Sequence, residues 1–174
     1  MTLAGADTVG MNAARLVNEL PVSELADLIA HYGKEGYARR IAEAIVASRR
    51  TGSILTTGQL VEIIASAVPK SYRSGRRHFA TKTFQALRIA TNDELGALRD
   101  GLSAVWSFLT SQGRLAVISF HSLEARLVKD RFREWVRTGQ GKLFTKHAIR
   151  PSREEEVRNP RSRSATLRII SKIN

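Results

Sequence analysis

Apolar positions in the first seventy residues recur at the spacing of amphipathic helices. This pattern predicts helices over residues 12–20, 23–31, 34–50 and 60–68. Gly33 follows the second of these helices, at the position where a residue with positive φ commonly ends a helix. Thr56 and Gln59 have the spacing of a capping box, and Pro69 ends the fourth helix. We therefore expect a small antiparallel helical bundle over residues 11–69.

The pattern changes after this bundle. Residues 71–78 are polar and basic, which predicts a hinge or a phosphate-contacting loop. A helical pattern then runs over residues 81–109, and because it is too long for one ordinary helix, we expect Asn92 to break it and to cap a new helix. Residues 114–120 form a short β-branched apolar run that predicts a buried strand of a parallel sheet, followed by a helix over 123–136.

Two more strands are expected near the C-terminus, over residues 143–148 and 165–172, and the second alternates in the manner of an antiparallel edge strand. Three strands and two helices amount to half of a doubly wound α/β sheet. A strand such as 114–120, apolar on both faces, normally has strand neighbours on both edges, and an open edge would be prone to aggregation. The sequence therefore predicts a sheet that lacks some of its strands.

Composition narrows the class of protein. The 174 residues include 28 Lys and Arg against 16 Asp and Glu, a formal net charge of +12, and 43% are hydrophobic, which is typical of a globular domain. No apolar run approaches the ~20 residues of a membrane span, and Met1–Gly10 lacks the pattern of a targeting peptide. Cysteine is absent, which excludes disulfides, thiol nucleophiles and cysteine-ligated metals. We expect a soluble, cytoplasmic domain with an anionic partner, foremost a nucleic acid.

The positive charge falls into two blocks. Residues 34–88 hold eleven basic and three acidic residues, a net +8, and residues 114–174 hold fifteen and six, a net +9. The segments 1–33 and 89–113 carry −3 and −2. Two basic blocks indicate two surfaces that bind one polyanion, although Lys and Arg also simply solvate helix faces.

Candidate catalytic or binding side chains lie at the end of the 114–120 strand, in the run Ser119-Phe120-His121-Ser122. Ligands of open α/β sheets bind outside the carboxyl ends of strands, which is where this run lies. His121 is a candidate proton acceptor or hydrogen-bond partner for a base edge, oriented by Ser119 and Ser122. The alternative is structural: His121 is a satisfied structural residue and Ser122 caps the next helix.

Other chemistries lack their signatures. A G-x-S-x-G elbow, a P-loop and a G-x-G-x-x-G turn are all absent, and the four histidines stand too far apart in the sequence to indicate a metal site.

The segment 159–168 is dense in arginine. If the last strand runs antiparallel to 114–120, Arg161, Arg163 and Ser164 lie near His121 and form a basic edge for phosphate; the alternative is a solvated basic turn.

Four segments in order carry a family resemblance: YGKEGYARRIAEAIV, HFATKTFQALRIATNDEL, GRLAVISFHSLE and NPRSRSATLR. With them the chain resembles the small-subunit rRNA cytosine-N4 methyltransferase family from about Met11 to Lys172. The resemblance implies an α/β fold, a Rossmann-like class I methyltransferase domain with an all-α helical substrate-recognition insert. It also implies that S-adenosylmethionine is the cofactor and that a cytidine amine in the decoding region of small-subunit rRNA attacks its methyl group without a covalent intermediate.

The resemblance further implies how the chain is divided. Residues 1–75 correspond to the helical insert and residues 76–174 to the C-terminal half only of the methyltransferase domain, so we expect the N-terminal cofactor-binding half, with its glycine-rich loop, to be missing. Phe79, Lys82, Gln112 and Ala125 depart from the family's pattern. The chain is thus expected to be a fragment or split enzyme, a non-catalytic RNA-binding module, or a structural domain that awaits a partner chain.

By the same resemblance, Ser119, His121 and Ser122 form the active-site rim. No metal and no membrane are expected, and the partners are small-subunit rRNA or the 30S-type subunit, together with a missing N-terminal half or a homodimer partner. The residues expected to contact RNA are basic: Arg39, Arg40, Arg76, Arg77, Lys82, Arg88, Arg161 and Arg163.

Overall fold

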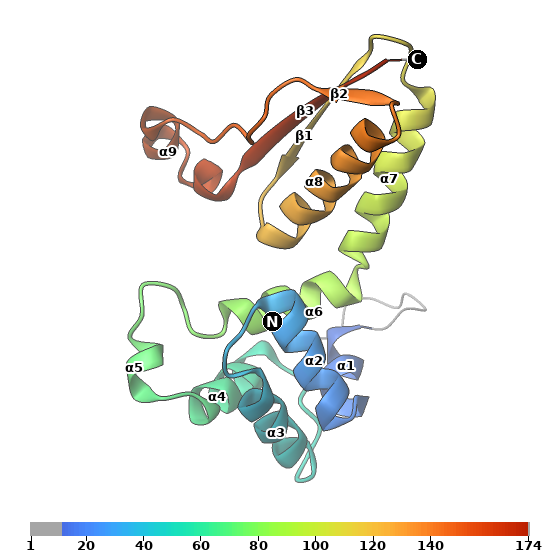
Figure 1. Ribbon diagram of the computed structural model, residues 1–174. Coiled ribbons are helices and arrows are strands. Elements are labelled where there is room, and N and C mark those ends of the chain that lie inside the picture. The colour runs from blue at the N-terminus through green and yellow to red at the C-terminus, as the bar shows by residue number, and fades with distance from the viewer. Residues whose placement is uncertain (1–11, 174) are drawn as a thin grey trace. The chain divides into compact units, whose positions relative to one another are not determined.

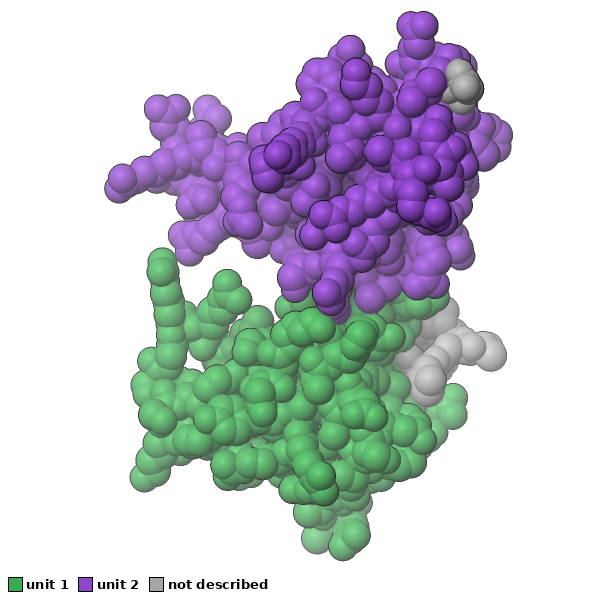
Figure 2. Space-filling view, viewed as in Figure 1, with its two compact units in different colours: residues 1–94 green, residues 95–174 purple. Residues whose placement is uncertain are grey.

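The structure is a computed structural model that describes residues 12–173, and the expectation for Met1–Gly10 lies outside this range. The chain divides into two compact units, unit 1 over residues 1–94 and unit 2 over residues 95–174 (Figure 2). Each unit has a hydrophobic core of its own, so each is described by itself.

Unit 1 is a bundle of helices, as the sequence predicts (Figure 1). Helix α2 packs against both α3 and α6, and α3 packs against α4. The largest fully buried side chains of these helices are aliphatic, and they include Leu16, Leu25, Ile29, Ile41, Ile45, Leu60 and Ile64. The helices are α1 (Ala13–Glu19), α2 (Val22–Gly33), α3 (Ala38–Arg49), α4 (Thr57–Ala67), α5 (Lys70–Arg73) and α6 (Thr81–Thr91).

Side-chain caps fix several helix ends. The predicted capping box is confirmed: Thr56 accepts a hydrogen bond from the backbone N–H of Gln59, whose side chain accepts from the N–H of Thr56. Helix α4 then ends at Ala67, two residues before Pro69. The segment expected to be a loop over 71–78 is partly helical, because α5 forms one turn directly after Pro69, which is well suited to a helix start.

Gly33 plays a different part from the one predicted. It is buried as the last residue of α2, and the positive φ belongs to Lys34, at 51°. Glycine is needed instead for close packing, since a Cβ built on Gly33 would lie 2.5 Å from the backbone oxygen of Lys82 in α6. The two backbones therefore meet at a distance that only glycine permits.

The long helical pattern divides where expected, but Asn92 is the C-cap of α6 and not the N-cap of α7 (Glu94–Phe108). Asp93, with φ of 44°, makes the turn between the two helices. Because α6 packs on α2, unit 1 extends to Glu94, whereas the helical insert is predicted from the sequence to end at residue 75.

Unit 2 contains a three-stranded sheet in the order β1-β3-β2, and both strand pairs are antiparallel. The prediction of a parallel sheet is therefore wrong for the strands described. The prediction that 165–172 is an edge strand is also wrong, because β3 lies at the centre of this sheet. The expected strand at 143–148 ends at Leu143, with only an isolated bridge at Ile149 after it. The strands are β1 (Arg114–Ser119), β2 (Gly141–Leu143) and β3 (Thr166–Lys172).

Helices α7 and α8 (Ser122–Arg137) pack on one face of this sheet (Figure 1). Their core includes Trp106 and Trp135, whose rings stack at 4.1 Å between centroids. The opposite face of β1 is open: Ile118 is 58% exposed, although a strand apolar on both faces is expected to be covered on both. Two further short helices, α9 (Arg153–Arg158) and the 3₁₀ helix η1 (Pro160–Ser164), precede β3.

Among residues 12–173, no helix is both long enough and apolar enough to cross a membrane.

Candidate functional site

The end of β1 and the start of β3 lie side by side. In the antiparallel register, Ser119 is paired with Thr166, so the last residue of β1 faces the first residue of β3. Arg161 and Arg163 belong to η1, which leads directly into β3. The sequence expectation that the final strand begins at the rim formed by the end of β1 is therefore confirmed.

The predicted rim residues Ser119, His121 and Ser122 lie at the end of β1 and the start of α8. Ser119 is buried, at 3% exposure, Phe120 is 54% exposed, and Ser122 is the exposed first residue of α8. The structure thus brings Ser119, His121 and Ser122 together in one strand-to-helix turn, as expected. The cap of α8 is not Ser122, however, but His121.

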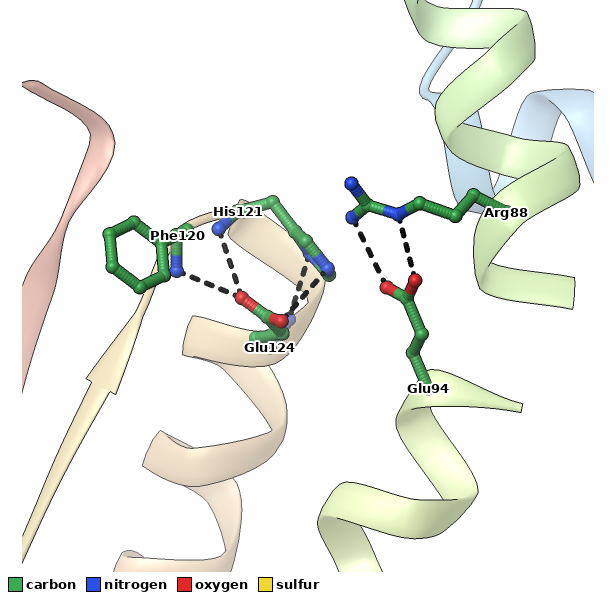
Figure 3. A network of polar contacts seen from close by, with 5 residues as sticks. All are labelled: Arg88, Glu94, Phe120, His121 and Glu124. Carbon is green, nitrogen blue, oxygen red and sulfur yellow. Dashed lines mark hydrogen bonds and ion pairs between the residues drawn. The ribbon is translucent and has the colours of Figure 1, made fainter. Parts of the chain in front are cut away.

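His121 forms a reciprocal capping box with Glu124 (Figure 3). The backbone N–H of Glu124 donates to Nδ1 of His121 at 3.3 Å. The Glu124 carboxylate in turn accepts from the N–H groups of Phe120 and His121, at 2.8 and 3.2 Å. These bonds satisfy backbone donors that a helix start would otherwise leave without partners.

Glu124 also contacts the second ring nitrogen, since its Oε1 lies 3.3 Å from Nε2 of His121. The side chain is 11% exposed and its Nδ1 accepts the capping hydrogen bond, so this geometry favours the structural interpretation of His121 over that of a proton acceptor. Glu124 is not among the predicted site residues, although a glutamate three residues after His121 is the sequence signal of such a box.

The basic residues predicted to contact RNA differ in their surroundings. Arg39 pairs with Glu43 at 3.0 Å, and Arg88 pairs with Glu94 at 2.7 Å (Figure 3), so a carboxylate offsets each charge. Arg76 and Arg77 are exposed in the segment between α5 and α6. These four residues, with Arg40 and Lys82, belong to unit 1, whereas Arg161 and Arg163 belong to unit 2.

Arg40 and Lys82 lie over aromatic rings. The Arg40 guanidinium is 5.9 Å from the centroid of Tyr37, and the Lys82 ammonium is 6.0 Å from that of Tyr72. Burial raises the pKa of Tyr72 to about 12, and the hydrogen bond that its hydroxyl donates to Glu35 adds to this shift. Tyr37, Tyr72 and Glu35 are not among the site residues predicted from the sequence.

The chain is similar to known proteins over nearly its whole length. The model of the MraW methylase family matches residues 3–173. The chain belongs to this family. Relatives named "Ribosomal RNA small subunit methyltransferase H" include those of Symbiobacterium thermophilum, 48% identical over 94% of this chain, and of Deinococcus radiodurans, 54% identical over 92%. A third, from Coprothermobacter proteolyticus, is 48% identical over 93% of the chain.

The chain spans about half the length of these curated relatives: the matched regions cover 56% of the Symbiobacterium protein, 50% of the Deinococcus protein and 53% of the Coprothermobacter protein. Methyltransferases of the MraW family use S-adenosylmethionine. The turn after β1 does not fit this cofactor, because Ser119, Phe120 and His121 include no glycine that would let a nucleotide approach the backbone closely. Within residues 12–173 we identify no set of residues that would hold it.

Proposed function

We propose that this chain supplies the RNA-binding surfaces and one wall of the active site of an S-adenosylmethionine-dependent enzyme. Its substrate would be small-subunit rRNA, and its product an N4-methylated cytidine of the decoding region. The observation that carries the proposal is the family match over residues 3–173, which includes both the basic helical unit and the rim where β1 and β3 meet.

In this proposal, unit 2 is the C-terminal half of a Rossmann-like methyltransferase domain, and residues 1–75 are its helical substrate-recognition insert. The second edge of β1 would pair with a strand of a cofactor-binding segment equivalent to the part of the relatives that this chain does not match. The same segment would cover two exposed apolar side chains, Ile118 in β1 and Phe120 directly after it, which are 58% and 54% exposed.

The rim residues would then face the target nucleotide. Arg161 and Arg163, directly before β3, are exposed donors suited to the phosphates beside the flipped base. Ser119, His121 and Ser122 would line the wall of the site, with Glu124 holding His121 in place. Because the proposed substrate is part of the 30S-type subunit, that subunit is the proposed partner. The proposed compartment is the cytoplasm. A homodimer is a further proposed state of the protein.

The test is transfer of isotopically labelled methyl groups from S-adenosylmethionine to 30S subunits that lack the modification. The chain would be assayed alone and with the N-terminal segment of the Symbiobacterium thermophilum relative that the chain does not match. We expect label at N4 of one cytidine only when both polypeptides are present. Labelling of another base, or no labelling by the pair although the intact relative is active, would contradict the proposal.

The runner-up is a non-catalytic RNA-binding module. The observation in its favour is that basic residues are exposed in both units, whereas the turn after β1 does not fit the cofactor. This function predicts salt-dependent rRNA binding that is the same with and without the N-terminal segment, and no methyl transfer in either case.

A further inference from the structure

A buried carboxylate lies within the basic part of unit 1. Glu35 is 4% exposed, although residues 34–88 carry a net charge of +8. It follows the end of α2, where Lys34 adopts a left-handed conformation and directs the chain toward α3. A carboxylate in this position is rare unless its oxygens have hydrogen-bond donors, so its partners show what it holds in place.

Both oxygens of Glu35 accept hydrogen bonds. The hydroxyl of Tyr72 donates to Oε2 at 2.7 Å, across 37 positions of the chain, and the backbone N–H of Tyr37 donates to Oε1 at 3.0 Å. The rings of Tyr37 and Tyr72 meet edge to face at 4.9 Å. Glu35 therefore fixes two aromatic rings, one at the start of α3 and one in α5, in a single arrangement.

Each of these rings carries a cation. Arg40 lies over Tyr37 and Lys82 over Tyr72, at 5.9 and 6.0 Å from the ring centroids. Neither cation forms an ion pair within residues 12–173, whereas Arg39, the neighbour of Arg40, is paired with Glu43. Cation–aromatic contacts orient a charge without neutralising it, so both groups stay available to an anion.

The position of Lys82 is constrained from a second side. Gly33, the last residue of α2, lies two positions before Glu35. Its close approach to the backbone oxygen of Lys82 fixes Lys82 of α6 against the end of α2. Lys70, Arg73, Arg76 and Arg77 are exposed and flank Tyr72 in the sequence. Arg40 and Lys82 therefore belong to the same unit as four further exposed basic residues.

We propose that Arg40 and Lys82 form a preorganised subsite for RNA phosphates, and that Glu35, Tyr37 and Tyr72 are its positioning residues. This inference rests on the proposed function, since it takes rRNA as the ligand. It adds that the negative charge of Glu35 strengthens RNA binding, because the carboxylate holds in place the rings that orient the two cations.

This proposal and simple attraction by net charge predict opposite changes in RNA affinity when Glu35 is replaced. Glu35→Gln removes a negative charge, so attraction by net charge alone predicts tighter RNA binding. Disruption of the positioning hydrogen bonds predicts weaker binding. Glu24→Gln is the matched control, because Glu24 is an exposed residue of α2 and its replacement makes the same change in charge.

The experiment measures fluorescence anisotropy of a labelled RNA containing the decoding region, titrated with the full chain over a series of salt concentrations. We expect Glu35→Gln and Tyr72→Phe to bind roughly fivefold more weakly. Glu24→Gln should bind as tightly as the unchanged chain, or slightly more tightly. Thermal unfolding of each variant shows whether unit 1 remains folded at the assay temperature.

Two variants of the cations themselves keep the proposal testable if Glu35→Gln unfolds unit 1. Arg40→Ala and Lys82→Ala should each weaken binding and reduce the salt slope by about 0.7 for each phosphate that the variant no longer binds. Arg39→Ala, with the same charge change next to Arg40, should have a smaller effect because Glu43 already offsets its charge. Equal effects of Arg39→Ala and Arg40→Ala, or tighter binding by a folded Glu35→Gln, would overturn the subsite. Failure of the unchanged chain to prefer this RNA over a DNA duplex would instead count against the proposed function.

Discussion

Gly33 and Lys82 are in backbone contact: a Cβ on Gly33 would lie 2.5 Å from the carbonyl oxygen of Lys82 and 3.1 Å from its carbonyl carbon. Real side chains essentially never approach backbone so closely, so any larger residue at position 33 must push α2 and α6 apart. This contact sets the distance between the two helices and the place of Lys82.

We predict that Gly33→Ala destabilises unit 1 by about 1–3 kcal/mol, the usual cost of overpacking. Gly101→Ala is the control, because Gly101 lies within α7 and a Cβ there meets nothing within 4 Å. That substitution should be neutral or stabilising by up to ~1 kcal/mol, since alanine favours helix more than glycine. Urea unfolding monitored by circular dichroism checks both, and equal stability of the two variants would show that the close packing at Gly33 does not matter.

The side chain of Lys172 caps the C-terminal end of α7. Its ammonium donates to the carbonyl oxygens of Trp106 and Leu109, at 3.0 and 2.7 Å. We predict that Lys172→Met lowers the free energy of unfolding of unit 2 by about 1–2 kcal/mol, because terminal carbonyls of the helix lose a charged donor. Lys142→Met, an exposed lysine of β2, should change it by less than ~0.5 kcal/mol. A similar loss of stability for both variants in urea unfolding would refute a capping role.

Substitutions of His121 separate capping from chemistry. His121→Ala removes the cap of α8 and should destabilise unit 2 by about 1 kcal/mol. Asparagine is a good N-cap, so His121→Asn should keep most of the stability. If His121 only positions the turn, the asparagine variant also keeps methyl transfer in the assay that combines this chain with the N-terminal segment of a relative. A stable but inactive His121→Asn would show instead that the imidazole takes part in the reaction.

Tyr72 makes unit 1 sensitive to alkaline pH. Its pKa is raised from 10 in the unfolded chain to about 12 in the folded one, because burial and the Glu35 hydrogen bond favour the neutral phenol. The associated stability is fully present below pH 10 and is lost as the pH rises toward 12. We therefore expect Tyr72→Phe to flatten the fall of melting temperature over this interval. Tyr32→Phe, which leaves the Glu35 contacts intact, should leave the curve unchanged; a curve equally steep for Tyr72→Phe would contradict this assignment.

Charge reversal tests the rim. We predict that Arg161→Glu with Arg163→Glu weakens RNA binding by at least tenfold and reduces the salt slope, because two phosphate contacts become repulsive. Arg133→Glu with Arg137→Glu changes the net charge equally but lies in the last turns of α8, at the end opposite His121. Anisotropy titrations should show a smaller decrease in affinity for this control, and an unchanged affinity and salt slope for the rim variant would remove the rim from the binding surface.

Much of the local structure follows from the sequence alone. The apolar spacing determines the helices of unit 1, the Thr56–Gln59 spacing determines the start of α4, and the β-branched run determines β1. These features are local: each depends on residues within one or two turns, whose side chains select the backbone conformation directly. The four ordered motifs also identify the family without any knowledge of tertiary contacts.

Features that depend on contacts between distant parts of the chain could be determined only from the tertiary structure. Strand order depends on pairing between segments far apart in the chain, so β3 proved central to the sheet, against the expectation that it lies at an edge. Gly33 is required by a neighbour 49 positions away and not by its own φ. Likewise, Glu35 acquires its role only when Tyr72 folds against it, because a hydrogen bond across 37 positions leaves no spacing to recognise in the sequence.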